Sequence, residues 1–583
     1  MRNLILLVFI CLLIVINTFT ISAIKVTEYS LNISIDNVKN DSMFSISPNY
    51  YWAAYTKKIG INQVCVVLNG KQGKPYDSIR GYANNSMEYN DKLVISRDGM
   101  HIAFQASRDG KWLICKDNIE GKLYVDVSPP IFSENGEGMI YKARSGDKWC
   151  VVFNGQESLY YNKIGSMNIS SDGCHYAFNA CNNDEGLVST VIDNTPLPAR
   201  QGKIDSLIIF SPNSKRVLTI CGGEKDAVDG GGEYVMVNGQ VGKKYSKIES
   251  PKFTVDSLHY YYMAVGEGIG NQYAIWDKIE SQSSSDIEGL ICNDNSMNVF
   301  YIMDRQYIIH NGCKVIIPKG NLISCFQDGS PAWKFSSDAK HYYCIIKQNK
   351  EQVAIVIDGV KGPDYDGISD VQMSMDGEHI AYIASRSGKM RVVYDGKESS
   401  LLFTNIDQLT LSPDGKRIAY VGLTSFLPDR KCTMVVDDIQ YGFNDGTLGK
   451  PYFSPDSKNI AYKMKVVNWE TMSFTTRIVV NGKEGKAYIF TTDPTFSSDS
   501  KHIAYFAEGD KDFCVVDNQE TPGYERIWTV TQSKDSNSFE TQTGWGFGEF
   551  AKPSIRQPVM DTNHSLHFFT MINKVYTTVN VEF

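Results

Sequence analysis

Histidine, aspartate and serine recur together along this chain of 583 residues, and these side chains can do acid–base, nucleophilic or metal-binding chemistry. Six of the nine histidines lie three residues after the aspartate of a repeated turn: His101, His175, His259, His341, His379 and His502. Arg216, Arg417, Asn298 and Asn459 fill the same position in other copies. Because a residue that recurs once per repeat is placed by the repeat geometry, we interpret these histidines and the turn carboxylates as structural.

Other patterns that could indicate chemistry are weak. The loop 182–186 (NNDEG) and the acidic group between Asp226 and Glu233 offer oxygen ligands for calcium, but neither has EF-hand spacing, so solvated loops are favoured. The glycines at 230–232 precede no Lys-Ser or Lys-Thr pair that would bind phosphate, and no Gly-x-Ser-x-Gly motif is present. We therefore predict no catalytic residue, no cofactor and no metal site.

The elements that position these residues come from one repeated segment. Residues 411–423 read LSPDGKRIAYVGL, residues 453–465 read FSPDSKNIAYKMK, and residues 496–508 read FSSDSKHIAYFAE. Thirteen copies align on the aspartate or asparagine of this turn, most of them 37 to 43 residues apart: Asn49, Asp98, Asn135, Asp172, Asn213, Asp256, Asn295, Asp338, Asp376, Asp414, Asp456, Asp499 and Asn563.

Each copy carries signals for two tight turns and about four short strands. Pro, Asp or Asn, and Gly favour the first turn. A second apolar run ends in Asn-Gly or Asp-Gly, as in VVLNG (66–70) and VVYDG (392–396), which indicates a hairpin. Four antiparallel strands in some forty residues form one propeller blade, and propellers typically have four to eight blades. We predict an all-β fold of tandem β-propellers, with about thirteen four-stranded blades in two rings.

The join between the two rings is expected where the repeat is most degraded, between residues 280 and 331. The predicted domains are a first β-propeller over 24–300 and a second over 301–583, each with six or seven blades. The second contains an insertion at 529–558.

The pattern xFSPDGKxIAY, followed by a Val-Val-x-Asp-Gly hairpin, resembles the WD40-like repeat of TolB-like β-propellers. The resemblance covers roughly residues 30 to 583 and is strongest between Asp376 and Asp499. It implies a propeller of the kind found mostly in exported prokaryotic proteins. It implies no single activity, because propellers carry many unrelated functions.

Residues 1–23 have the layout of a secretory signal peptide. Arg2 gives a positive start, an unbroken apolar run extends from Leu4 to Ile16, and a small-residue cleavage site follows at Ala23. We expect an exported protein, whether periplasmic, cell-surface or secreted, and no membrane span after the signal. An uncleaved N-terminal anchor is the alternative, although this run is short for a span of about 20 residues.

Twelve cysteines follow the signal, and four of them replace apolar residues of other copies: Cys65, Cys115, Cys150 and Cys514. We expect these four to be small core residues. Cross-strand disulfides remain an alternative for the others, with a pairing that the spacing does not define.

The two faces of the predicted rings differ. With the strands of a blade named A to D, the A–B and C–D turns share one rim and are uniform. The B–C and D–A connections share the opposite rim and vary in length. Variable loops on a rigid scaffold usually carry recognition. We predict that this variable-loop face binds the partner, with Phe426, Trp469, Trp545 and Phe547 as candidate contacts.

The leading hypothesis for function is an exported binding or scaffold protein that engages a protein, peptide or envelope partner. The net charge of −8, without concentrated basic blocks, argues against nucleic acid. The alternative is a propeller enzyme, a lyase or hydrolase, with its site at one channel mouth. Non-repeated His, Arg, Asp or Glu residues gathered there would favour the enzyme.

Overall fold

The computed structural model describes residues 24–34, 44–46, 53–60, 63–80, 93–182, 187–223, 232–267, 271–292, 299–304, 307–310, 313–315, 321–322, 332–336, 340–349, 351–424, 431–443, 446–468, 470–471, 473–525, 527–528, 530–532, 539–541, 565–572 and 575–582. In this part of the chain the secondary structure is entirely β, without an α-helix. The strands form thirteen antiparallel sheets of four or five strands and one two-stranded sheet. We number the thirteen sheets first to thirteenth, in the order of the turn copies that they contain.

The first four sheets follow the chain from residue 44 to residue 201. Their strands are β2 (Phe44–Ile46), β3 (Ala53–Gly60), β4 (Gln63–Leu68) and β5 (Lys71–Gln72); β6 (Ser78–Ile79), β7 (Val94–Ile95), β8 (Ile102–Arg108), β9 (Lys111–Lys116) and β10 (Ile119–Glu120); β11 (Asp126–Val127), β12 (Ile131–Phe132), β13 (Met139–Ser145), β14 (Lys148–Phe153) and β15 (Gln156–Glu157); β16 (Lys163–Ile169), β17 (Tyr176–Cys181), β18 (Leu187–Ile192), β19 (Thr195–Pro196) and β20 (Arg200–Gln201).

The fifth to eighth sheets continue to residue 365. Their strands are β21 (Ile208–Phe210), β22 (Val217–Gly223), β23 (Gly232–Val237) and β24 (Gln240–Tyr245); β25 (Lys247–Phe253), β26 (Tyr260–Val265), β27 (Gln272–Trp276) and β28 (Ile279–Glu280); β29 (Ile287–Cys292), β30 (Val299–Met303), β31 (Tyr307–His310) and β32 (Cys313–Val315); β33 (Asn321–Leu322), β34 (Trp333–Phe335), β35 (Tyr342–Lys347), β36 (Val353–Ile357) and β37 (Val360–Tyr365).

The ninth to twelfth sheets end at residue 520. Their strands are β38 (Gly367–Met373), β39 (Ile380–Arg386), β40 (Lys389–Tyr394) and β41 (Lys397–Glu398); β42 (Asn405–Leu411), β43 (Ile418–Leu423), β44 (Cys432–Val436) and β45 (Ile439–Phe443); β46 (Gly446–Leu448), β47 (Tyr452–Phe453), β48 (Ile460–Asn468), β49 (Ser473–Val480) and β50 (Lys483–Glu484); β51 (Phe490–Thr491), β52 (Thr495–Phe496), β53 (Ile503–Glu508), β54 (Asp512–Val516) and β55 (Gln519–Glu520).

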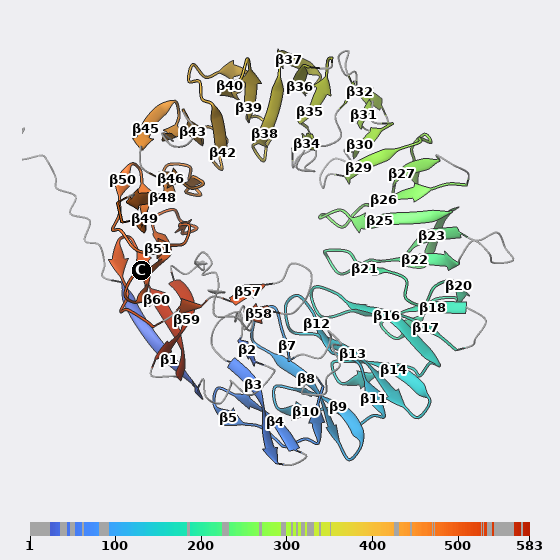
Figure 1. Cartoon of the computed structure of the whole chain (residues 1–583). Helices are drawn as coiled ribbons and strands as arrows, with labels where there is room; N and C mark the ends of the chain where they lie inside the picture. Colours follow the sequence, from blue (N-terminus) through green and yellow to red (C-terminus); the bar gives the residue numbers. More distant parts are fainter. Residues whose placement is uncertain are drawn as a thin grey trace, which may run out of the picture.

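The thirteenth sheet joins the two ends of the described chain. Its strands are β56 (Ile527–Trp528), β59 (Ser565–Ile572), β60 (Val575–Glu582) and β1 (Lys25–Ser34), in the order β1-β60-β59-β56. The two-stranded sheet, β57 (Val530–Gln532) and β58 (Phe539–Thr541), lies inside the predicted insertion. In Figure 1 the sheets follow one another around a single ring, and strands such as β25, β38 and β42 lie toward its centre.

The alternation of side chains along each strand explains how the sheets pack. In β43, Ile418 and Tyr420 face one neighbouring sheet and pack against Ile383 of β39. The intervening Ala419 and Val421 face the other neighbour and pack against Ile460 of β48. Because side chains point alternately to the two faces of a strand, a strand buried on both sides must be apolar at nearly every position. The same arrangement recurs from sheet to sheet, so the core is a series of layers between sheets.

The all-β fold with four-stranded sheets is confirmed, but the predicted division into two rings is wrong. At the expected join, Phe300, Ile302 and Ile308 of the seventh sheet pack into one core with Phe335 and Cys344 of the eighth, and Figure 1 shows one ring. The turn motif is degraded in this region, but the strand faces remain apolar: all five residues of β30 are buried. A weak turn signal therefore does not mark a domain boundary in this region.

The four cysteines expected in the core are buried, which confirms their assignment: Cys65, Cys115, Cys150 and Cys514. Nine cysteines of the described ranges are free thiols: Cys65, Cys115, Cys150, Cys174, Cys181, Cys221, Cys344, Cys432 and Cys514. The predicted signal, residues 1–23, lies outside these ranges. No helix of the described chain is long and apolar enough to cross a membrane.

Candidate functional site

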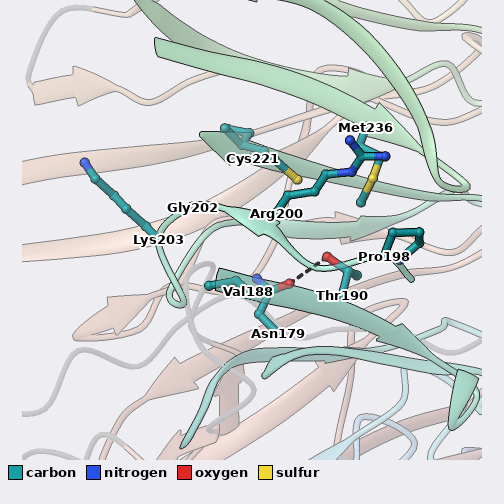
Figure 2. A pocket seen from close by; sticks show the side chains of 10 residues that line it. Asn179, Val188, Thr190, Pro198, Arg200, Gly202, Lys203, Cys221 and Met236 are labelled. Carbon is teal, nitrogen blue, oxygen red and sulfur yellow. Dashed lines mark hydrogen bonds between the residues drawn. The ribbon is translucent and has the colours of Figure 1, made fainter. Parts of the chain in front are cut away.

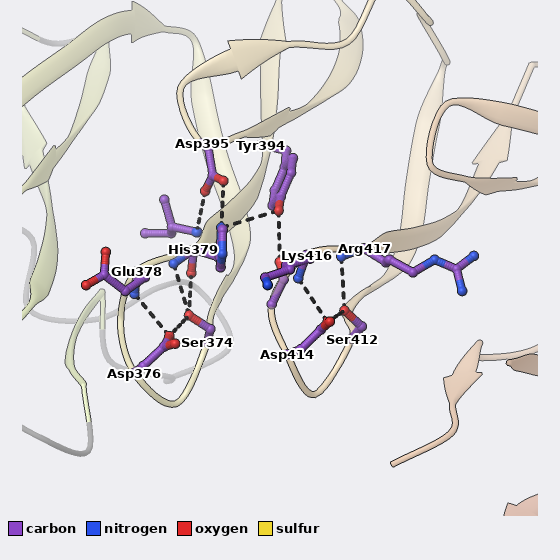
Figure 3. A network of polar contacts seen from close by, with 12 residues as sticks. Ser374, Asp376, Glu378, His379, Tyr394, Asp395, Ser412, Asp414, Lys416 and Arg417 are labelled. Carbon is purple, nitrogen blue, oxygen red and sulfur yellow. Dashed lines mark hydrogen bonds and ion pairs between the residues drawn. The ribbon is translucent and has the colours of Figure 1, made fainter. Parts of the chain in front are cut away.

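The repeated histidines lie on the rim formed by the A–B and C–D turns, and each has the same partner. In the ninth sheet, the Nδ1 atom of His379 is 2.8 Å from Oδ2 of Asp395, and Oδ1 of Asp395 accepts a hydrogen bond from the backbone N–H of Ile380 (Figure 3). Nδ1–Oδ2 distances of 2.6–2.8 Å recur in all six pairs: His101–Asp117, His175–Asp193, His259–Asp277, His341–Asp358, His379–Asp395 and His502–Asp517.

The serine of the same turn is not arranged as an activated nucleophile. The Ser374 hydroxyl donates to Oδ1 of Asp376 and accepts the backbone N–H of His379 (Figure 3). A hydrolase triad requires instead that the serine hydroxyl contact the imidazole. The Ser374 hydroxyl also lowers the pKa of the Asp376 carboxyl. These contacts support the structural interpretation of the histidines and of the turn carboxylates, because every group is used to hold the two turns together.

Neighbouring turns also contact one another along this rim. In the tenth sheet, Gly415 has φ +73°, and a Cβ atom there would lie 2.8 Å from Cδ2 of His379 in the ninth. The Asp414 N–H donates to the Ser457 hydroxyl of the eleventh sheet, and the Arg417 guanidinium donates to the carbonyl of the same serine. The turns of the ninth, tenth and eleventh sheets are therefore linked to one another along this rim.

A second set of contacts links neighbouring sheets near the ring's outer edge, and sequence analysis missed it. A buried tyrosine of one sheet donates its hydroxyl to a glutamate of the next, with O–O distances of 2.7–3.1 Å. The pairs are Tyr76–Glu120, Tyr124–Glu157, Tyr245–Glu280, Tyr365–Glu398, Tyr488–Glu520 and Tyr524–Glu28. The tyrosine follows the C–D turn residue by seven positions, and each glutamate other than Glu28 follows its own turn residue by three.

In five of these pairs the tyrosine hydroxyl helps to lower the pKa of the glutamate: Glu120, Glu157, Glu280, Glu398 and Glu520. The Tyr365 hydroxyl is the main cause for Glu398, with contributions from two arginines. Arg108, helped by Tyr76, lowers the pKa of Glu120 to about 2. A carboxyl whose pKa is lower in the folded state stabilises the fold above its unfolded pKa, and this stabilisation is lost as the pH falls through the folded value.

We predict that the Tyr365→Phe substitution reduces the free energy of unfolding by about 1–2 kcal/mol at pH 7, since a buried hydrogen bond to a charged group is lost. It also reduces the loss of stability below pH 4.5, because Glu398 then has a more ordinary pKa. Urea unfolding between pH 7 and pH 3 measures both effects.

Tyr161→Phe is the matched control. Tyr161 has the same register, but Pro196 stands where the glutamate would be. Within the described part of the chain, the buried Tyr161 hydroxyl has no hydrogen-bond partner. Its substitution is expected to leave both the stability and its pH dependence unchanged. Equal effects of the two substitutions would contradict a stabilising role for the tyrosine–glutamate pairs.

The opposite rim carries the B–C and D–A connections, as the sequence predicted. Oδ2 of Asp77, in a D–A connection, accepts the Asp109 N–H of a B–C turn at 2.7 Å, and Asp366 accepts the Ser387 N–H at 2.6 Å in the same way. The candidate contacts Phe426, Trp469, Trp545 and Phe547 all lie outside the described residues. So do loop 183–186 and residues 224–231, in the two acidic segments considered for calcium.

One described feature projects from this variable-loop face. β48 and β49 are nine and eight residues long and form a hairpin in the eleventh sheet, with Asn468 at its tip capping the N–H of Glu470. Phe474 on this hairpin is 45% exposed, and Nζ of Lys465 lies 3.9 Å from the centre of its ring. The hairpin thus presents an aromatic ring beside a cation.

A small pocket lies between the fourth and fifth sheets on the same face (Figure 2). Its lining combines two basic side chains with polar and apolar ones: Asn179, Val188, Thr190, Pro198, Arg200, Gly202, Lys203, Ile220, Cys221 and Met236. Figure 2 shows Arg200 extending between Cys221 and Met236. Burial raises the pKa of the Cys221 thiol to about 11, and the Arg200 charge opposes this shift.

Comparison with family models gave no match to this chain, and neither did comparison with curated proteins. Solved structures with propeller domains are similar to it at low identity. The tricorn protease is 14% identical, with a TM-score of 0.23, over 82% of this chain and 54% of that chain. The Dos1 propeller is 11% identical, with a TM-score of 0.25, over 54% and 90%.

The β-propeller domain of the trilobed protease from Pyrococcus furiosus is also 11% identical, with a TM-score of 0.22, over 51% of this chain and 90% of that one. Similarity at this level carries no argument about activity. The sheets themselves define the fold. The two rims are the surfaces that distinguish a structural role from a binding role.

Proposed function

We propose that the chain is an exported, TolB-like propeller scaffold that binds a protein or peptide partner through its variable-loop face. The export part of the proposal is supported by the signal-like layout of residues 1–23. The binding part is supported by the contrast between the two rims.

The difference between the two rims is the observation that supports binding through the variable-loop face. On the turn rim, the polar side chains are used in repeated contacts such as His379–Asp395 and Ser374–Asp376. On the opposite rim, the connections differ from sheet to sheet, from the short turn at Asp109 to the long hairpin that presents Phe474. A uniform rim serves the fold, whereas loops that vary on a rigid frame are suited to recognition.

The test compares two exposed apolar residues on opposite rims. Phe474 and Met375, which are 45% and 77% exposed, are each replaced by photoreactive benzoylphenylalanine in the intact exported protein. After irradiation of envelope preparations, we expect position 474 to give a discrete crosslinked product in several-fold higher yield than position 375. Mass spectrometry then identifies the attached protein.

The position on the turn rim serves as the control, because it is the more exposed of the two and so reports random collisions. A discrete product from position 375 alone, or the same products from both positions, would contradict binding through the variable-loop face.

A further inference from the structure

The pocket between the fourth and fifth sheets lies where the tyrosine–glutamate pairing of the repeat is altered. Arg200 follows its turn residue, Asp193, by seven positions, as every paired tyrosine does. It also has the same register within its sheet: Arg200 pairs with Val188, as Tyr488 pairs with Thr476 in the eleventh. Arg200 therefore occupies the position of the tyrosine, and its side chain faces the fifth sheet.

The glutamate that would receive this side chain is missing. Three residues after the turn residue Asn238, the fifth sheet has Val241. Val241 pairs with Met236, just as Glu484 pairs with Val479 in the eleventh sheet, so the register is unchanged. Arg200 thus places a cation where the paired copies have a tyrosine hydroxyl. Val241 places an apolar side chain where those copies have a carboxylate.

The surroundings of Arg200 favour an anion. Its Nε atom is buried and has no hydrogen-bond partner in the ranges that the structure describes. Among the described residues, no carboxylate lines the pocket and no ion pair joins Arg200 to one, whereas Lys203 adds a second cation to the lining. Burial raises the pKa of the neighbouring Tyr234, and the Arg200 charge opposes the shift, which places the phenol close to the cation.

We propose that Arg200 binds a carboxylate of the partner, supplied by an acidic side chain or the C-terminus of a peptide. A guanidinium matches a planar carboxylate with two parallel hydrogen bonds, and such a pair is stronger where water is largely excluded. The apolar part of the lining, Ile220 and Met236, suits the aliphatic stem of such a group. That the carboxylate comes from a peptide, and not from a free small anion, rests on the proposed function.

The test uses calorimetric titration of the mature protein with succinate and with a short peptide, acetyl-Ala-Glu-Ala-amide. Their uncharged analogues, succinamide and acetyl-Ala-Gln-Ala-amide, are titrated in parallel. We expect both acids to bind at least tenfold more tightly than their analogues, and Arg200→Gln to remove this difference. Arg477→Gln is the control, because Arg477 already has its own carboxylate, Glu484, at 2.5 Å, and it should leave binding unchanged.

Val241→Glu gives a second test that does not depend on losing the arginine. It restores a carboxylate beside Met236, where it can fill the site from within the protein. We expect this variant to unfold at a higher temperature without ligand and to bind both acids at least tenfold more weakly. Undiminished binding by Arg200→Gln or by Val241→Glu would overturn the site.

The outcomes also separate the two proposals. Binding of succinate without binding of the glutamate peptide would keep the carboxylate site and overturn its assignment to a peptide. Crosslinking from position 474 reports partner binding independently, so it can fail while the carboxylate site stands.

Discussion

Replacing Phe300 with alanine is expected to lower the free energy of unfolding by about 3–5 kcal/mol, the usual cost of deleting a buried aromatic ring. Phe300 is 1% exposed in the core between the seventh and eighth sheets. Its ring centre lies 4.3 Å from that of Phe335 on the other side of the predicted ring boundary. The core here is built like those between other neighbouring sheets, so this interface is expected to stabilise the fold to a similar extent.

A double-mutant cycle makes the test specific to the ring architecture. Phe300→Ala, Phe335→Ala and the double variant are unfolded in urea, and the coupling free energy is taken from the four stabilities. We expect a coupling of about 0.5–1.5 kcal/mol beyond burial, as found for contacting aromatic rings. Phe104→Ala, at the interface between the first and second sheets, is the matched single control and should cost a similar amount. Strictly additive effects would contradict direct packing between the seventh and eighth sheets.

The strands could be predicted from the sequence because their signals are local. The Ser-Pro-Asp-Gly turn and the Asn-Gly or Asp-Gly hairpin each lie within five residues, and the structure has sheets at the predicted copies. The number of rings could not be predicted in this way. It depends on the angle between neighbouring sheets, which many side-chain volumes set together. The segment 299–303 shows the difficulty, since its turn signal is weak while all five residues are buried.

The candidate site was harder to predict, for a related reason. The tyrosine–glutamate pairs join residues of different copies, for example Tyr124 and Glu157, which are 33 positions apart. Comparing the copies position by position could have found them, together with the exceptional Arg200 and Val241. The sequence instead favoured aromatic residues of the variable loops, such as Trp469 and Phe426. These lie outside the described residues, and their role in binding stays a prediction.

The strand β1 leads to the second large effect, because it supplies the outer strand of the thirteenth sheet. Residues Lys25 to Ser30 of β1 pair with β60 in continuous antiparallel register. Ile24 and Val26 pack against the core between the twelfth and thirteenth sheets. Glu28 accepts the hydroxyl hydrogen bond of Tyr524 at 3.1 Å. Glu28 thus provides, from the start of the described chain, the glutamate that every other tyrosine pair takes from a strand following a C–D turn.

Removing residues 24–34 is therefore expected to destabilise the ring by about 4 kcal/mol or more, through lost apolar burial and lost hydrogen bonds. It also leaves β60 as an unpaired edge, and an exposed edge strand promotes aggregation. Urea unfolding and light scattering measure the two effects. The control is Lys25→Ala, which removes only the exposed ion pair with Glu582 and should cost under about 1 kcal/mol.

A synthetic peptide of residues 24–34 separates loss of this strand from a general failure to fold. Added to the truncated chain, it is expected to pair with β60 and restore the cooperative transition, since a free sheet edge accepts a strand supplied in trans. The same peptide with Glu28→Gln should restore less stability, because the hydrogen bond from Tyr524 then ends on a neutral group. A truncated chain as stable as the intact protein would mean that β1 is not needed to hold the ring. Equal rescue by both peptides would show that strand pairing alone restores stability, without a contribution from the charge of Glu28.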